Sequence, residues 1–425
     1  MRVPFHFSFI HAADLHLDSP FRIHEAGNDA LRKVLLDASA KAFSRLCEVA
    51  IERKVDFIIL AGDIFDGPER GVRTQLMLRR HLMDLQEQGI SVYIAFGNHD
   101  PLESSESLSI DWPKNLFTFP SFPERLPMER NGVKYAEITG VSYETREEPR
   151  NLAQLFPDAG EDVFNIAVLH ANVGQSREHG NYAPAALADL KAKGYHYWAL
   201  GHIHKREILC EDPLVIYPGN IQGLHMKPSE RGLKGAEFVE VDETGVRHSF
   251  MPLSETIFNK VTVDVSGFQN VSAMIEGCLE SIRHAATAAG GKTLVLSVDL
   301  VGTLEEKLWG LAKDLEPLHD ELRMGIGNLQ LSVFIEHLDA HVLRGQGLEG
   351  LAGLSDVVSE LIDVIAQWRK SPVLLAEFPV EAELRSVLVS SIKRAAIGYS
   401  LRLQQDDIDG AEHLLAELFR EVGEK

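Results

Sequence analysis

Five short motifs rich in aspartate and histidine follow predicted strands in the first half of the sequence. They are DLH at 14–16, GDIFD at 62–66, GNHD at 97–100, the histidine at 170, and GHIH at 201–204. Carboxylate, amide oxygen and imidazole together suit divalent ions such as Mn²⁺, Fe²⁺ and Zn²⁺. A single Asp-x-His or His-x-His pair would be weak evidence, but five motifs in this order, each after a buried strand, predict a metal centre.

The strands that carry these motifs are short apolar runs without polar alternation. They cover residues 7–13, 55–61, 91–96, 164–169 and 197–200, with helical patterns at 29–53 and 71–88. Such runs, separated by helices, are typical of sheets covered on both faces, so we expect an α/β layer structure. Side chains at the carboxyl ends of neighbouring strands converge on one crevice.

The spacing within the motifs also fits a metal centre. In an extended segment, residues two apart point to the same side, as Asp14 and His16 would. Glycines beside Asp63, Asn98 and His202 suit tight turns after a strand. Two divalent ions about 3.5–4 Å apart can clamp the attacking and leaving oxygens of an in-line displacement. The motifs therefore predict hydrolysis of phosphoester bonds.

The rest of the chain predicts two further parts. Apolar runs at 214–217, 236–242 and 246–252 indicate strands that complete a first domain of residues 1–255. Residues 256–345 predict a small α+β capping domain, with strands at 257–266, 293–302 and 329–338 and helices at 270–289 and 304–317. Residues 346–425 predict a helical segment, with helices at 351–370, 380–397 and 406–422.

Composition limits the possible environment and partners. The chain has 42 Lys+Arg against 63 Asp+Glu, a net charge of −21, whereas nucleic-acid binders usually carry a basic surface. Any nucleic-acid substrate must therefore be held locally or with help from a partner. No apolar stretch is long enough to span a membrane, and the first nine residues lack a signal-peptide pattern. Three dispersed cysteines fit a reducing compartment, so a cytoplasmic location is expected.

The motifs DLHLD, GDIFD, GNHD, LHANV and GHIH resemble those of the calcineurin-like metallophosphoesterases, over residues 7 to about 255. The stretch from Tyr182 to His204, with YPGNIQG at 217–223 and KGAEFV at 234–239, narrows the resemblance to bacterial SbcD/YhaO-type DNA repair exonucleases, nearer the YhaO branch. It implies a metallophosphoesterase β-sandwich flanked by helices and hydrolysis of DNA phosphodiesters.

The resemblance also implies how the metal ligands divide between two ions. One ion would be bound by Asp14, His16 and His204. The other would be bound by Asn98, His170 and His202, and Asp63 would bridge both. Manganese is the expected ion, with iron, zinc and magnesium as alternatives.

Further site residues do not bind metal in this prediction. His99 would protonate the leaving oxygen, and we hypothesise that Asp66 accepts a hydrogen bond from it. Archaeal and eukaryotic relatives carry a second active-site histidine where this chain has Asp66, so this departure concerns the branch of the family. Arg70 and His225 are the candidate phosphate contacts, and Arg73, Lys205 and Arg206 are further cations near the motifs.

The resemblance implies three partners: DNA as substrate, an SMC-like coiled-coil ATPase tethered through the C-terminal helices, and a second copy of the chain. The copies would pair through the helix at 71–88, which carries apolar residues at 76, 78, 82, 83 and 85. Two alternatives remain open. One is a phosphatase or phosphodiesterase of a small nucleotide, which the acidic charge favours. The other is a mainly scaffolding subunit of an ATPase complex, against which the complete ligand set argues.

Overall fold

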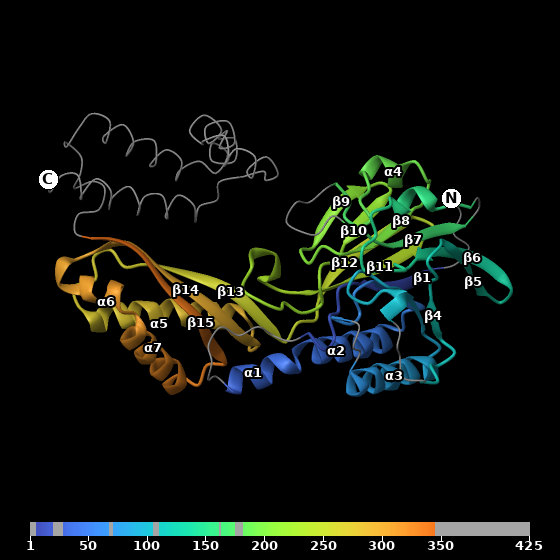
Figure 1. Cartoon of the computed structure of the whole chain (residues 1–425). Coiled ribbons are helices and arrows are strands. Elements are labelled where there is room, and N and C mark those ends of the chain that lie inside the picture. The colour runs from blue at the N-terminus through green and yellow to red at the C-terminus, as the bar shows by residue number, and fades with distance from the viewer. Residues whose placement is uncertain are drawn as a thin grey trace, which may run out of the picture. The chain divides into compact units, whose positions relative to one another are not determined.

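The apolar runs of the first domain form two six-stranded sheets (Figure 1). The first has the order β12 (Gly245–Pro252), β11 (Gly235–Asp242), β1 (Phe7–Ala12), β2 (Phe57–Ala61), β3 (Ser91–Ala95) and β4 (Leu116–Thr118). The second has the order β5 (Glu124–Arg130), β6 (Val133–Val141), β7 (Phe164–His170), β8 (Tyr197–Gly201), β10 (Leu214–Tyr217) and β9 (Glu207–Glu211).

The computed structural model describes residues 6–19, 29–67, 71–104, 110–160, 163–174 and 182–344. The chain divides into two units, Met1–Phe258 and Asn259–Lys425. The division therefore falls three residues beyond the predicted boundary at residue 255 and inside strand β13 (Thr256–Asp264).

Each sheet of the first unit has four adjacent parallel strands and two further strands that pair antiparallel. These two lie on the same side of the parallel strands in the first sheet and on opposite sides in the second. Strands β1 to β4 run parallel, and β11 and β12 extend that sheet antiparallel. In the second sheet, β6, β7, β8 and β10 run parallel between β5 and β9. Because four parallel strands in each sheet point the same way, their carboxyl ends gather side chains at one edge of that sheet.

The two sheets pack face to face through an aromatic layer. The Phe9 ring stacks on Phe57 at 5.0 Å and meets the edge of Tyr197, from the second sheet, at 5.2 Å. The alternate residues of β1, Ile10 and Ala12, belong to a separate core on the other face. Both faces of β1 are buried, which explains why its sequence does not alternate. The predicted α/β sandwich flanked by helices is confirmed.

Helices cover the outer faces of the sandwich. Helices α2 (Ala38–Arg53) and α3 (Val72–Glu87) contribute buried side chains to the core beside the first sheet (Figure 1). The short elements η2 (Leu152–Leu155) and α4 (Leu187–Lys191) contribute to the core beside the second. The single helix predicted at 29–53 is wrong in one respect, because α1 (Asp29–Leu36) ends before Asp37 and α2 begins after it.

The hairpin β5–β6 was absent from the predicted elements. Its turn is Asn131-Gly132, and both residues have positive φ, 52° and 72°. An Asn-Gly pair between two strands is a strong signal for this type of turn, so local sequence could have revealed the hairpin. The charged residues of β5 lie at an edge of the sheet, where they weaken the apolar pattern.

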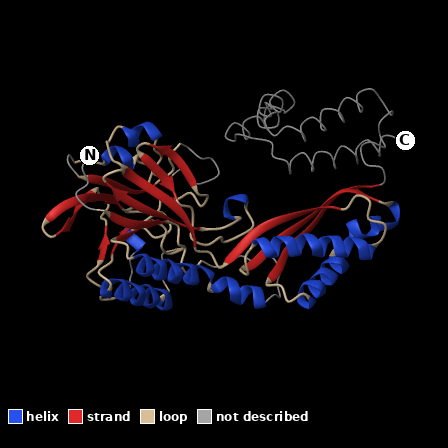
Figure 2. Cartoon of the chain, turned by 180° about the vertical axis from the view of Figure 1, so that it is seen from behind, coloured by secondary structure: helices blue, strands red, loops and turns tan. Residues whose placement is uncertain are grey.

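The second unit is a three-stranded sheet with helices packed beside it (Figure 2). Along the chain it contains β13, α5 (Val271–Ala288), β14 (Thr293–Leu304), η4 (Glu306–Leu308), α6 (Trp309–Lys313), α7 (Glu316–Asn328) and β15 (Val333–Arg344). The predicted order of strands holds, but the helix predicted at 304–317 is wrong. Pro317 lies in the first turn of α7, where a missing N–H costs nothing, and so marks the start of a separate helix.

Two findings bear on the remaining expectations for the whole chain. No helix within the described ranges is long and apolar enough to cross a membrane. The helices predicted at 351–370, 380–397 and 406–422 lie outside the described residues.

The carboxyl ends of β2 and β8 approach closely at Gly201. A Cβ atom added there would lie 1.7 Å from the carbonyl oxygen of Ala61 and 2.9 Å from Nδ1 of His170. Gly201→Ala should therefore lower the free energy of unfolding by at least about 1–3 kcal/mol, the usual cost of overpacking. Gly327→Ala in α7 meets no atom within 4 Å and serves as the control. Urea denaturation measures both, and equal stability of the two variants would contradict the close approach.

Candidate metal centre

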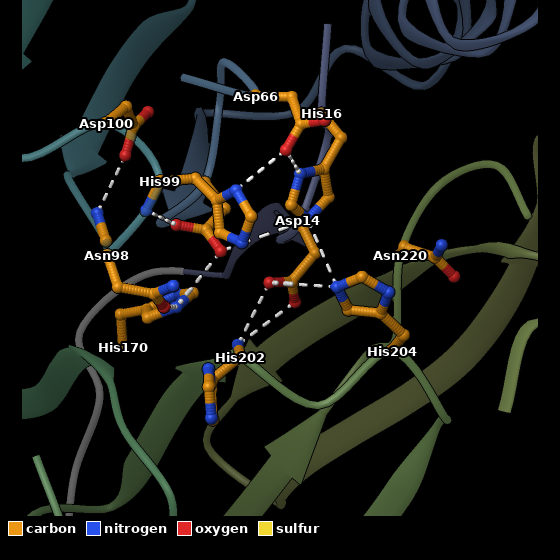
Figure 3. Close-up of polar contacts among 12 residues, drawn as sticks. Asp14, His16, Asp66, Asn98, His99, Asp100, His170, His202, His204 and Asn220 are labelled. Atoms are coloured by element: carbon orange, nitrogen blue, oxygen red, sulfur yellow. Dashed lines mark hydrogen bonds and ion pairs between the residues drawn. The ribbon is translucent and has the colours of Figure 1, made fainter. Parts of the chain in front are cut away.

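Side chains from both sheets meet where five parallel strands end (Figure 3). These side chains follow β1, β2 and β3 of the first sheet and β7 and β8 of the second. The residues brought together are Asp14, His16, Asp63, Asp66, Asn98, His99, His170, His202 and His204. All except Asp66, His99 and His204 are buried.

The backbone at these positions is unusual. Asp14, His16 and Asp63 have φ values of 51°, 43° and 52°, in the left-handed region that few non-glycine residues adopt. His202 has φ 104°. The loops after β1 and β2 hold each other, since Asp14 N donates to Gly62 O at 3.0 Å and His16 N to Asp63 O at 3.0 Å. Such conformations persist only where surrounding structure enforces them, and they cluster at functional sites.

Asp100, the last residue of GNHD, holds two of the loops in place. One carboxylate oxygen accepts hydrogen bonds from Ile64 N at 2.7 Å and Phe65 N at 3.2 Å. The other accepts from Gly97 N at 2.9 Å. The carboxylate is fully buried and joins the loop after β2 to the loop after β3. Sequence analysis assigned Asp100 no role, although its place inside the motif was the available signal.

One group of potential ligands consists of Asp14, His16 and His204, whose donor atoms all lie within 4.8 Å of one another. The two Nε2 atoms of His16 and His204 face each other at 3.1 Å. His204 Nε2 is 4.0 Å from Asp14 Oδ1. Two imidazole nitrogens and a carboxylate converging in this way have the composition of a divalent metal site.

A second group consists of Asp14, Asp63 and His170. His170 Nδ1 donates to the carbonyl of Ala61 at 3.0 Å, which leaves the lone pair of Nε2 directed into the centre. That Nε2 is 3.4 Å from Asp63 Oδ2 and 3.0 Å from Asn98 Oδ1. Asp63 Oδ2 is also 3.9 Å from His16 Nε2, and Asp63, His16 and His99 form a third group of potential ligands. Asp14 belongs to both groups above, and Asp63 contacts a member of each, so its role as a bridging ligand stays a prediction.

His202 is placed differently from the other predicted ligands. Its backbone N–H donates to both carboxylate oxygens of Asp14 at 3.1 Å, and its ring meets the His170 ring edge-on at 5.2 Å. The ring belongs to neither of the two groups above, so its role as a ligand stays a prediction.

Asp66 contacts both a predicted ligand and the predicted acid. Its Oδ1 is 2.7 Å from His99 Nδ1 and 3.2 Å from His16 Nδ1, and Ser19 donates to its Oδ2 at 2.7 Å. His99 is held a second time, because its backbone N donates to Asp63 Oδ1 at 2.9 Å. With Nδ1 bonded to Asp66, Nε2 is the His99 nitrogen available to a substrate.

The electrostatics of the crevice favour positive charge. Burial lowers the pKa of His16, but the hydrogen bond to Asp66 and the charges of Asp63 and Asp14 outweigh it and raise this pKa to about 9. For His170, burial is outweighed chiefly by the charge of Asp63, and the pKa is again about 9. Burial opposes ionisation of Asp63, yet the neighbouring histidines hold its pKa well below the usual range. This surplus of buried negative charge fits the binding of cations by these oxygen and nitrogen donors.

The candidate phosphate contacts are Arg70 and His225. Arg70 lies outside the described residues, and His225 Nε2 is 3.9 Å from the buried carboxylate of Glu230. Arg206 forms an ion pair with Glu237 and lies over the Phe250 ring. Lys205 and Arg206 are both exposed, and Arg206 is the one held by this ion pair.

Comparisons with known proteins show which proteins this chain is similar to. Residues 7–206 match the family model described as calcineurin-like phosphoesterase. An uncharacterized metallophosphoesterase, YhaO of Bacillus subtilis, is 37% identical over 71% of this chain and 73% of its own length. The DNA double-strand break repair protein Mre11 of Sulfolobus acidocaldarius is 23% identical over 73% of this chain and 79% of its own. Mre11 of Sulfurisphaera tokodaii is 28% identical over 40% and 44%.

The raised pKa values predict a pH dependence of the metal-free protein. Folding keeps protons on His16 and His170 that the unfolded chain loses near pH 6.5, so their contribution is present below about pH 6.5 and is lost as the pH rises through about 9. The free energy of unfolding should fall between pH 6.5 and 8 by up to about 1.4 kcal/mol per pH unit for each histidine. Above this window Lys234, whose pKa burial lowers to about 8, offsets the loss.

Urea denaturation of chelator-treated protein at several pH values measures this slope. His170→Gln should reduce it, and His6→Gln, at a histidine whose side chain is 57% exposed, is the control. If His170→Gln keeps the full slope, the raised pKa of His170 is wrong.

Proposed function

Since this chain belongs to the calcineurin-like phosphoesterase family and is a metal-dependent phosphoester hydrolase, we propose that its substrate is a DNA phosphodiester, cleaved as by an exonuclease or endonuclease in DNA repair. The hydrolytic part rests on the position of Asp63, which shares one group of donors with Asp14 and His170 and another with His16 and His99. The similarity to two proteins named for DNA double-strand break repair supports DNA as substrate.

The residues of the centre have separable roles in this proposal. When bound, two divalent ions, manganese in the first place, supply neutralisation of charge on the reacting phosphate and acidify a water molecule. Asp14, His16 and His204 would hold one ion, Asn98, His170 and His202 would hold the other, and Asp63 would be shared between them. His99 donates a proton from Nε2 to the leaving sugar oxygen, while Asp66 holds the ring through Nδ1.

The charge of −21 favours one alternative, hydrolysis of a small nucleotide ester. A small substrate needs no basic surface, whereas a nucleic acid repels an acidic one. Against it stands the similarity to the Mre11 protein of Sulfolobus acidocaldarius, which extends over 319 residues and therefore beyond the catalytic domain.

End-labelled single- and double-stranded DNA, incubated with Mn²⁺ or Mg²⁺, tests the substrate. We expect degradation of the labelled strands, and His99→Ala should reduce turnover about 10²- to 10⁴-fold because the leaving oxygen loses its acid. Metal content should stay unchanged in His99→Ala, and His248→Ala, a histidine that contacts Glu237 outside the centre, should cleave normally. Hydrolysis of a chromogenic diester by a protein that leaves DNA intact would favour the small-nucleotide alternative.

A homodimer through α3 is part of the same proposal. Of the apolar residues predicted for this surface, Leu78, Leu82 and Leu85 lie in the core. Leu76 and Met83 are 53% and 41% exposed, so the outward face of α3 retains apolar side chains. The wild-type chain should be dimeric by light scattering at micromolar concentration, and Leu76→Glu should yield monomers because it places charge on that face. The control Arg79→Glu changes charge on the same helix without removing an apolar side chain. A monomeric wild-type chain would contradict the proposal.

We also propose an SMC-like ATPase partner that contributes DNA-binding surface in the cytoplasm. The net charge of −21 supports it, since the chain itself is poor in cations. Truncation after Gly350 should leave hydrolysis of a small diester nearly unchanged and abolish association with the ATPase. Co-purification measures association, with the full-length chain as reference. A truncated chain that still binds the partner, or one that no longer folds, contradicts this assignment.

A further inference from the structure

A buried carboxylate outside the predicted ligand set contacts His204 from behind. Glu230 ends η3 (Pro228–Glu230), in the segment between β10 and β11, and is 1% exposed. Its Oε1 accepts a hydrogen bond from His204 Nδ1 at 2.5 Å. None of the five motifs contains Glu230, which lies 26 residues after His204 in another loop.

The other oxygen of Glu230 is held by its own segment. Oε2 accepts from Asn220 Nδ2 at 2.7 Å and from Leu224 N at 3.0 Å. A carboxylate removed from water is tolerated where hydrogen bonds replace its hydration, and both oxygens here have such donors. The position of Glu230 is therefore defined from two sides.

The same segment also holds the backbone of His204. Lys234 Nζ donates to His204 O at 2.8 Å and also to the carbonyl of Ser229. Asn220 N donates to His204 O at 3.3 Å, and Asn220 pairs with Ala13 in an isolated β-bridge. Ring and carbonyl of His204 are thus both fixed by residues 220–234.

The contact decides which nitrogen of His204 faces the centre. With the proton on Nδ1 and directed to Glu230, the lone pair lies on Nε2, the atom that is 3.1 Å from His16 Nε2. A carboxylate behind a metal-binding imidazole orients the ring and increases its basicity. His16 has the same arrangement through Asp66, whereas His170 is held by the neutral carbonyl of Ala61.

We propose that Glu230 is a positioning residue of the metal centre: it holds His204 as an Nε2 donor and strengthens the site formed by Asp14, His16 and His204. This inference rests on the metal-dependent part of the proposed function. The test measures metal binding and not DNA cleavage. A chain that binds metal without cutting DNA would therefore contradict the proposed substrate, but not the proposed role of Glu230.

Titration of the full-length, chelator-treated protein with Mn²⁺, followed by calorimetry, tests the proposal. Glu230→Gln keeps the size of the side chain and removes its charge, and it should weaken one of the two sites about 10- to 100-fold while the other keeps its affinity. Glu237→Gln is the matched control, because Glu237 is equally buried and also contacts a histidine, His248, away from the centre. Its titration should match that of the wild type. Equal affinities in Glu230→Gln and wild type would overturn the assignment.

A double-mutant cycle separates positioning from a general effect on the fold. If Glu230 acts through His204, Glu230→Gln should cause no further loss of affinity in a His204→Ala background. Additive losses would instead assign Glu230 a structural role.

A wild-type measurement keeps the proposal testable even if Glu230→Gln does not fold. In the Zn²⁺-loaded protein labelled with ¹⁵N-histidine, nitrogen shifts should show His204 bound to metal through Nε2 with Nδ1 protonated. The resonance is assigned by its absence in His204→Ala. Binding through Nδ1 would refute the proposal.

Discussion

Negative charge collected among buried side chains, with little access to water, is the constraint on which this structure depends. Asp14 and Asp63 are almost fully buried, and Asp66 lies beside them. Carboxylates repel one another strongly where water cannot screen them. Histidines therefore surround them, and backbone N–H groups of His99 and His202 donate to them. A pair of divalent cations would complete this balance, and bound cations of this kind suit phosphoester chemistry.

The sandwich provides the stiffness that such a centre requires. Predicted ligands with positive φ would relax to ordinary conformations on mobile loops, but here the loops follow strands buried on both faces. Asp100 joins two of these loops through backbone amides, and Glu230 holds His204 from a third segment. Buried carboxylates thus have two roles in this chain: some belong to the metal centre, and others hold the residues that form it.

The acidic surface shapes the proposed DNA function. Arg206, the second cation after the GHIH motif, is held by the buried Glu237 and so is less available to a phosphate. The crevice itself attracts positive charge, as the raised pKa values of His16 and His170 show. A phosphodiester would therefore be attracted mainly by bound cations.

The sequence by itself determined the strand-end motifs, the α/β class and the residue types of the metal centre, because these depend on local periodicity and on ligand chemistry. The resemblance also implied Asp63 as a shared ligand, and the Asp66–His99 contact was hypothesised beforehand. Only the tertiary structure decided that Asp66 contacts His16 as well. The break at Asp37 and the new helix at Pro317 were missed, since apolar periodicity continues across both. Glu230 could not be identified from sequence, because its contact with His204 joins two loops 26 residues apart whose meeting depends on how β10 and β11 lie in different sheets.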